Sequence, residues 1–168
     1  MAVNSATNNI AVQGPNNSLR VFWAVNGTEL WHSIRVAGSG RVFSAPSMTV
    51  DGNFVDIAAE GPNHSLVFYW ADKVTGAWHL ETVAGPGTTF SAPSIAVNGN
   101  AVNIVADGPA QSLQFYWAAS STATWHAETV AGSGAVASGP SIAANGNVVN
   151  ISAVMSPRSM MAYSAMCQ

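Results

Sequence analysis

The stretch GPNHSLVFYWADKVTGAWHLETVAG, residues 61–85, occurs in two further versions in the same chain. The related stretches are GPNNSLRVFWAVNGTELWHSIRVAG at residues 14–38 and GPAQSLQFYWAASSTATWHAETVAG at residues 108–132. The three versions begin 47 residues apart, and each holds a Trp-His pair near its end. A repeat of this length is typical of stacked supersecondary units and not of an ordinary globular fold.

The repeat extends over nearly all of the 168 residues. Residues 54–100 align with residues 101–147 without a gap and share 28 identities in 47 positions. A fourth copy begins after Asn147 but does not reach a Trp-His element. We therefore predict four structural units, at residues 1–43, 44–90, 91–137 and 138–168, of which the last is incomplete.

Each repeat is predicted to contain four short strands. In the third copy, APSIAVNGN is a strand that enters the turn Asn98-Gly99, a favoured hairpin dipeptide, and AVNIVADGP is a second strand that ends at Gly108-Pro109. The third strand, SLQFYWAA, places Leu113, Phe115 and Trp117 on one face, and TWHAETVAG is the fourth strand. No segment combines a 3.6-residue period with helix caps, so we expect essentially no helix.

Four antiparallel strands in about 47 residues fit the blade of a β-propeller, and we predict this all-β fold. A blade is packed on both faces by its neighbours, so Leu66, Phe68 and Trp70 are expected to fill the space between blades. A β-solenoid is disfavoured by the long unit. A β-trefoil, which has three repeats of similar size, is disfavoured by the additional part-repeat.

A propeller has to close into a ring, commonly of four to eight blades. The chain could close alone as a four-bladed ring, or several copies could join head to tail. The fourth unit lacks its outer strand, and no spare outer strand precedes the first unit. Closure of a single chain by a shared blade is therefore not expected. We predict a homodimer that completes a ring of seven or eight blades.

The composition excludes several classes of partner. Only 8% of the residues are charged, against about 25% in typical soluble domains. The net charge of −3 and the five Lys and Arg residues argue against nucleic acid binding. No apolar run approaches the roughly 18 residues of a membrane span, and no signal peptide is visible. We expect a cytoplasmic protein or one released by a non-classical route.

Enzymatic activity and cofactors are not expected. The eight carboxylates form no sequence-local pair suited to acid–base catalysis, and no glycine-rich phosphate loop precedes a helix. Cys167, the single cysteine, lies in the incomplete unit and excludes a disulfide framework. The recurring histidines lie on strands predicted to be outermost, so they are not expected to converge on a metal ion. These are His32, His79 and His126.

The repeated polar and aromatic residues favour carbohydrate binding. Each unit carries an acceptor before its Gly-Pro turn, namely Gln13, Glu60 or Asp107, together with a Trp-His pair. Aromatic faces stack on the C–H surface of sugars, and weak repeated sites gain avidity of about 10² to 10⁴. A multivalent lectin is therefore predicted. The alternative is a structural or protein-binding propeller in which the aromatic residues serve packing and the acidic residues bond to turn amides.

The unit APSIAVNGN, VNIVADGP, SLQFYWA and TWHAETVAG resembles the blades of bacterial seven-bladed β-propeller lectins. The best-known members recognise fucose and O-methylated sugars, which lie between adjacent blades against Trp side chains and nearby polar groups. The resemblance implies glycan-binding roles for Trp31, Trp78, Trp125, His32, His79, His126, Glu60 and Asp107. In the fourth unit Val154 and Ser164 replace Asp107 and Trp117, so this blade is expected not to bind.

Overall fold

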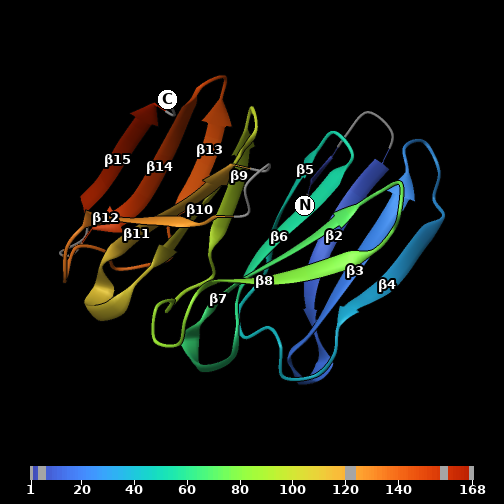
Figure 1. Ribbon diagram of the computed structural model, residues 1–168, viewed down its shortest axis with the longest axis horizontal. Helices are drawn as coiled ribbons and strands as arrows, with labels where there is room; N and C mark the ends of the chain where they lie inside the picture. The colour runs from blue at the N-terminus through green and yellow to red at the C-terminus, as the bar shows by residue number, and fades with distance from the viewer. Residues whose placement is uncertain (1, 4–6, 120–123, 156–158, 167–168) are drawn as a thin grey trace.

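The computed structural model describes residues 2–3, 7–119, 124–155 and 159–166, which form four antiparallel sheets in chain order (Figure 1). The first sheet contains β1 (Ala2–Val3), β2 (Thr7–Gly14), β3 (Ser18–Val25) and β4 (Trp31–Ala37). The second contains β5 (Ser47–Asp51), β6 (Phe54–Glu60), β7 (Leu66–Asp72) and β8 (Trp78–Ala84). The third contains β9 (Ser94–Asn98), β10 (Ala101–Asp107), β11 (Leu113–Ala119) and β12 (His126–Ala131). The fourth contains β13 (Ser141–Asn145), β14 (Val148–Met155) and β15 (Ser159–Met166).

The predicted all-β blade architecture is confirmed. Within each sheet the strands pair with their neighbours in sequence, as in a meander. The helical segments in the described residues are three short 3₁₀ turns at Pro15–Asn17, Pro62–His64 and Pro109–Gln111. Each one begins at the proline of a Gly-Pro dipeptide between the second and third strands of a sheet, where the repeat predicts a turn.

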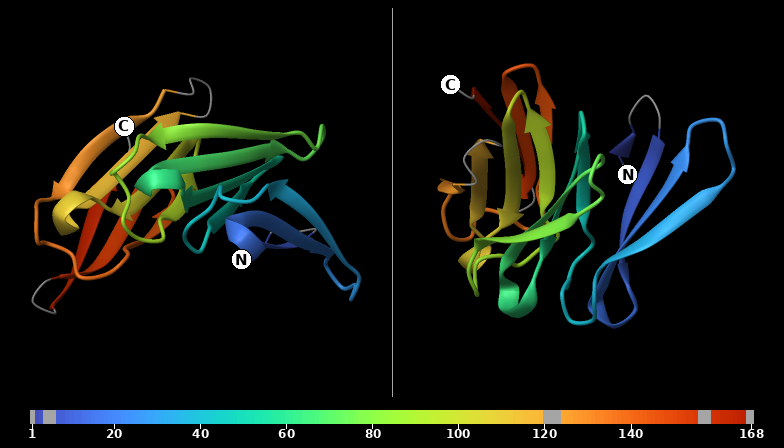
Figure 2. Two further views of the ribbon diagram at one scale, coloured as in Figure 1. Left: turned by 90° about the horizontal axis from the view of Figure 1, so that it is seen from below. Right: turned by 45° about the vertical axis from the view of Figure 1, so that its right-hand side comes forward.

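The sheets meet along their first strands. β9 lies between β5 and β13, and Figures 1 and 2 show the four sheets standing side by side in the order of the chain. The Ile95 N–H donates to Ser47 Oγ at 3.2 Å, and one repeat later the Ile142 N–H donates to Ser94 Oγ at the same distance. A recurring hydrogen bond therefore links β5 to β9 and β9 to β13.

The third strand of each inner sheet contributes to two hydrophobic cores. Leu66 and Phe68 of β7 pack toward the third sheet, while Val67 and Tyr69 pack toward the first. Alternation of side chains along a strand produces this division. Full burial of a side chain such as Leu66 contributes roughly 1.5 to 3 kcal/mol. Packing of Leu66 and Phe68 between sheets agrees with the expectation from the sequence.

Each of the three sheet–sheet junctions has its own buried cluster. Between the first and second sheets lie Leu19, Val21, Val42, Met48, Val55, Ile57, Ala59, Val67 and Tyr69. Between the second and third lie Ala58, Leu66, Phe68, Ile95, Val102, Ile104 and Tyr116. Between the third and fourth lie Ala96, Val105, Leu113, Phe115, Val136, Ile142, Val149, Ile151 and Ala153. The buried apolar side chains therefore lie between pairs of sheets and not within a single sheet.

The Gly-Pro turns hold the linkers that lead to the next sheet. In the second sheet Asn63 and His64 have positive φ, and their carbonyl oxygens accept hydrogen bonds from the N–H groups of Gly87 and Thr88. The glycine before the proline is required by close packing. A Cβ atom at Gly108 would lie 2.4 Å from Gln114 Cγ.

The hydrogen bond at Ser94 Oγ can be tested by its removal. Ser94→Ala leaves the partly buried N–H of Ile142 without its acceptor, so we expect a loss of about 1 to 2 kcal/mol in the free energy of unfolding, measured in urea. Ser141→Ala is the matched control, because this exposed serine occupies the same repeat position in the fourth sheet. Equal effects of the two substitutions would contradict a role for this bond between sheets.

Candidate functional site

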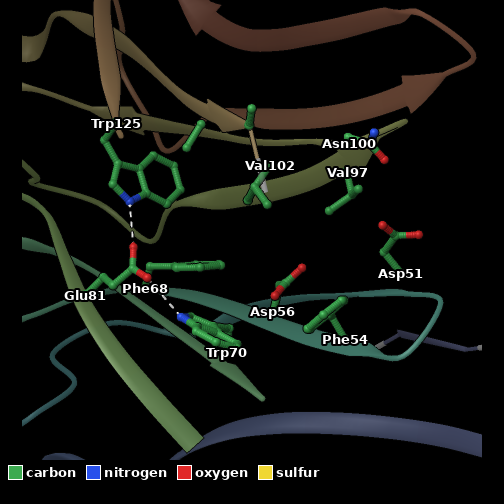
Figure 3. Close-up of a pocket in the computed structure, with 12 residues that line it drawn as sticks. Asp51, Phe54, Asp56, Phe68, Trp70, Glu81, Val97, Asn100, Val102 and Trp125 are labelled. Carbon is green, nitrogen blue, oxygen red and sulfur yellow. Dashed lines mark hydrogen bonds between the residues drawn. The ribbon is translucent and has the colours of Figure 1, made fainter. Parts of the chain in front are cut away.

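A pocket of about 460 Å³ lies between the second and third sheets (Figure 3). This volume falls within the range of roughly 300 to 1,000 Å³ that is typical of ligand pockets. It opens at the end of the sheets that carries the β5–β6 and β9–β10 hairpin turns. Its lining consists of Asp51, Phe54, Asp56, Phe68, Trp70, Glu81, Val97, Asn100, Val102, Ala118, Ala119 and Trp125.

Glu81 connects the two walls of the pocket. Its Oε1 accepts a hydrogen bond from Trp70 Nε1 at 2.9 Å, and its Oε2 accepts one from Trp125 Nε1 at 3.0 Å. Trp70 belongs to the same sheet as Glu81, whereas Trp125 precedes β12 of the third sheet. One carboxylate thus fixes two indole rings and joins the outer parts of two sheets, as Figure 3 shows.

Further aromatic contacts hold the two indoles in place. His79 stacks on Trp70 with 4.1 Å between ring centroids, and Phe68 meets Trp125 edge to face at 5.2 Å. Phe54 contacts Trp70 edge to face at 6.2 Å. The edge-to-face geometry is favoured by the ring quadrupoles. These contacts pack both indole rings, which are only partly buried, against other aromatic rings at the pocket wall.

Asp56 places a buried carboxyl group at the wall of this pocket. Its residue is 5% exposed, and no hydrogen bond from the described part of the chain reaches its carboxyl oxygens. Burial raises the pKa of Asp56 to about 7, and the negative charges of Asp51 and Glu81 contribute in the same direction. The carboxyl group of Asp56 is therefore harder to ionise than an exposed aspartate.

The other sheets carry an amide at the position of Asp56. One repeat earlier stands Asn9, and one repeat later stands Asn103, whose side-chain amide donates to the Ala101 carbonyl at 3.0 Å. Asn9 likewise donates to the Thr7 carbonyl, at 3.3 Å. An ionised Asp56 has no proton for such a bond. The pocket between the second and third sheets therefore differs chemically from its equivalents.

The three repeated tryptophans lie in three different environments. Trp125 lines the pocket, whereas Trp78 packs against the core between the first and second sheets. Trp78 also lines a smaller hollow of about 230 Å³ together with Arg41 and Tyr69. Trp31 on β4 is 47% exposed. The difference arises because each of these tryptophans faces the preceding sheet, and the described chain has no sheet before the first.

The recurring histidines stack on tryptophans of the neighbouring strand. His32, His79 and His126 lie over Trp23, Trp70 and Trp117, with ring centroids 5.5, 4.1 and 5.2 Å apart. None of the three histidines lines the larger pocket, although His79 lines the smaller hollow. The three histidines therefore pack against tryptophan rings from the outer strand of each sheet.

Glu60 and Asp107 lie at the opposite end of their sheets from the pocket, next to the Gly-Pro turns. Glu60 Oε1 is 2.7 Å from His64 Nδ1. Burial raises the pKa of Asp107, and its Oδ1 is buried without a partner among the described residues. Of the eight binding residues predicted from the sequence, the structure brings Trp125 into the larger pocket.

Sequence reasoning did not assign the remaining residues of the pocket. Trp70 and Phe68 were expected to serve packing, and they do so while also lining the pocket. Two signals were present in the sequence. Asp56 is a carboxylate inside the apolar strand FVDIAA, and Glu81 has Ile34 as its counterpart in the first unit.

The described residues contain no group of three or more His, Cys, Asp or Glu side chains placed to hold a metal ion. Their helical segments are too short to cross a membrane.

Comparison with known proteins establishes the fold. No family model and no curated protein matches the sequence. Among solved structures, the BP39L lectin from Burkholderia pseudomallei aligns over 98% of this chain and 51% of its own, with a TM-score of 0.83 and 16% identity. A triple-substituted AofleA from Arthrobotrys oligospora aligns over 99% and 55%, with a TM-score of 0.74 and 13% identity.

The chain folds into all-β blades of the propeller type. It resembles the BP39L lectin in structure and spans about half the length of BP39L and AofleA. NanB sialidase from Streptococcus pneumoniae also aligns, over 92% of this chain and 27% of its own, with a TM-score of 0.66 and 13% identity. Because propeller folds support different activities, function has to be argued from the pocket.

The asparagines at the position of Asp56 in the other sheets suggest a test of how the Asp56 carboxyl group affects stability. The pKa of Asp56 is about 7 in the folded protein and 3.8 without the fold, so the folded state binds the extra proton between these values. Stability therefore falls as pH rises from about 4 to 7. Asp56→Asn removes this loss and is expected to raise the free energy of unfolding at pH 8 by up to about 4 kcal/mol.

Urea unfolding at pH 5 and pH 8 measures this difference. The reverse substitution, Asn103→Asp, places an acid at the equivalent buried position and should introduce the same loss of stability above neutral pH. If Asp56→Asn leaves the dependence on pH unchanged, the carboxyl group of Asp56 is not the buried titrating group.

Proposed function

We propose that this chain is a carbohydrate-binding protein without catalytic activity, and that a sugar binds in the pocket between the second and third sheets. The observation that carries the proposal is the carboxylate of Glu81, which holds Trp70 and Trp125 as fixed walls of an open pocket. Oriented aromatic rings with a few convergent polar groups are the general features of a small-molecule site.

The pocket suits the two kinds of surface that a pyranose ring presents. Its C–H face can rest on the rings of Trp70, Trp125 or Phe68, and its hydroxyl groups can donate to Asp51 and Asp56. The likeness to BP39L, a protein named as a lectin, supports the same function. Fucose and O-methylated sugars, implied by the resemblance of the repeat to bacterial propeller lectins, are the first ligands to test.

Binding without hydrolysis is favoured by the state of the carboxylates. Glycoside hydrolysis generally requires one carboxyl group as acid and a second as nucleophile or base. Both oxygens of Glu81 already accept hydrogen bonds from indole N–H groups, so this carboxylate is engaged in holding the two rings. The proposal therefore assigns Glu81 the role of holding the binding surface.

The other junctions are proposed to bind less strongly or to serve packing. At the first junction Ile34 replaces Glu81, so the carboxylate that would join Trp23 to Trp78 is missing. The polar residues predicted from the sequence, including His79 and Glu60, are proposed to have supporting roles. A chain with one strong site gains avidity only through further copies.

We propose that a second copy of the chain supplies the missing neighbours and forms a homodimer. Among the described residues no sheet covers the face of the first sheet that carries Trp31, and Val154 is 37% exposed on the outer face of the fourth sheet. Because the chain spans 51% of the BP39L chain, two copies together would approach its length. Trp31 of each copy would then face the fourth sheet of the other.

A glycan array tests the binding function. Trp125→Ala removes one wall of the pocket and one donor to Glu81, so we expect at least a tenfold loss of signal from sugars bound by the unmodified chain. Val74→Ala, in a turn and 77% exposed, should bind normally. Circular dichroism establishes that both variants are folded. A blank array from the folded protein would favour the alternative, a structural or protein-binding propeller.

Light scattering after size-exclusion chromatography tests the homodimer. The expected mass is twice that of one chain, and Val154→Lys should reduce it to that of a monomer, since a charge would enter an apolar contact. Val74→Lys is the control at a surface outside the proposed interface. A monomeric mass for the unmodified chain at micromolar concentration would contradict this assembly.

A further inference from the structure

The charged groups that line the pocket between the second and third sheets are all acidic. They are Asp51 from β5, Asp56 from β6 and Glu81 from β8. The wall formed by the third sheet has no ionisable side chain among the lining residues. A ligand that enters this pocket therefore meets three carboxyl groups and no opposing cation, which disfavours anionic sugars.

Asp56 is an unpaired acid that points into the pocket. Figure 3 shows its carboxyl group directed into the space between the sheets, where no hydrogen bond from the described residues reaches it. The same position in the neighbouring sheets is occupied by Asn9 and Asn103, whose amides bond to the backbone two residues earlier. An amide would thus satisfy the fold better than the acid. A buried acid at this position is suited to accept a hydrogen bond from a ligand in the pocket.

The surroundings of Asp56 favour an organic cation over a metal ion. No group of three or more ligating side chains in the described residues is arranged for a metal. Instead, aromatic rings of Phe54, Phe68 and Trp70 lie around the carboxyl groups. Aromatic faces attract ammonium groups, and the attraction increases when water is excluded.

A lysine near the rim does not neutralise the pocket. Lys73 follows β7, and its Nζ donates to the Gly52 carbonyl at 2.8 Å. It interacts electrostatically with Asp51 but is not among the residues that line the pocket. The carboxyl group of Asp56 therefore has no cationic side chain beside it among the residues that line the pocket.

We propose that this pocket selects an amino sugar, with the sugar's protonated amino group against Asp56 and its ring on the aromatic walls. The inference rests on the proposed carbohydrate-binding function and names its ligand class. The ammonium group would donate to the carboxyl oxygens of Asp56, which receive no hydrogen bond from the described residues. An N-acetylated sugar has lost the charge and would lose this interaction.

Titration calorimetry at pH 7 tests the selectivity. Glucosamine, glucose and N-acetylglucosamine form one series, and galactosamine, galactose and N-acetylgalactosamine form a second. In at least one series we expect the amino sugar to bind about tenfold more tightly than its hydroxyl and N-acetyl counterparts, as a charge-assisted hydrogen bond would provide. Asp56→Asn should bring this ratio close to one, and Asp51→Asn should reduce it.

The variants separate binding from stability. Asp56→Asn is expected to be more stable than the unmodified chain, so a loss of selectivity would not result from unfolding. Glu29→Gln is the control, because this exposed acid lies outside the pocket. It should leave the ratio unchanged.

Each outcome bears on the proposal. If neutral sugars bind and the amino sugars have no advantage, amino-sugar selection is wrong while the lectin function stands. If the selectivity persists in Asp56→Asn, the assigned acid is wrong. If no sugar binds to the folded protein, both this inference and the proposed function fail.

Discussion

The structure depends on the fact that a sheet with two apolar faces has to be covered on both. Leu66 and Phe68 point to one side of β7, and Val67 and Tyr69 point to the other. Neither pair can be buried within its own sheet, so the second sheet requires a neighbour on each side. The repeat of 47 residues supplies these neighbours with matching faces. The stability of the chain therefore resides in its junctions.

The same constraint explains why equivalent residues differ in environment. Trp31, Trp78 and Trp125 occupy one position of the repeat and face the preceding sheet. Both Trp78 and Trp125 pack against an apolar core, but Trp125 also donates to Glu81, whereas the repeat position of Glu81 in the first sheet holds Ile34. A single substitution between copies decides whether a junction carries a carboxylate held by two indoles. Repetition thus supplies the framework, and departures from the repeat supply the chemistry.

Asp56 is a departure that places an acid where the other sheets carry an amide. Burial raises the pKa of this carboxyl group to about 7, and the charges of Asp51 and Glu81 act in the same direction. The asparagines at equivalent positions show that the fold accepts an amide there. Strained or destabilising groups of this kind concentrate at functional sites. This links the electrostatics of the second sheet to the ligand chemistry of its pocket.

Much of the fold could be predicted from the sequence. The period, the Asn-Gly hairpin turns, the Gly-Pro turns and the alternation along SLQFYWAA are local patterns, and they were enough to predict four-stranded blades. The packing of Leu66 and Phe68 between sheets followed from the same alternation. These features depend on neighbours in sequence or on the repeat itself, so they can be predicted from the sequence alone.

The binding site was decided by the tertiary structure. Trp125 was assigned from the sequence, but its partner Glu81 lies 44 residues away in another sheet. Glu60 and Asp107 share the sheets of the pocket residues but stand at the opposite end, a separation that residue type alone does not reveal. Which carboxylate meets which aromatic ring depends on the register of β7 with β8 and on the contact between two sheets. The sequence determined the blade by itself, whereas the junction between two blades created the pocket because its walls come from different repeats.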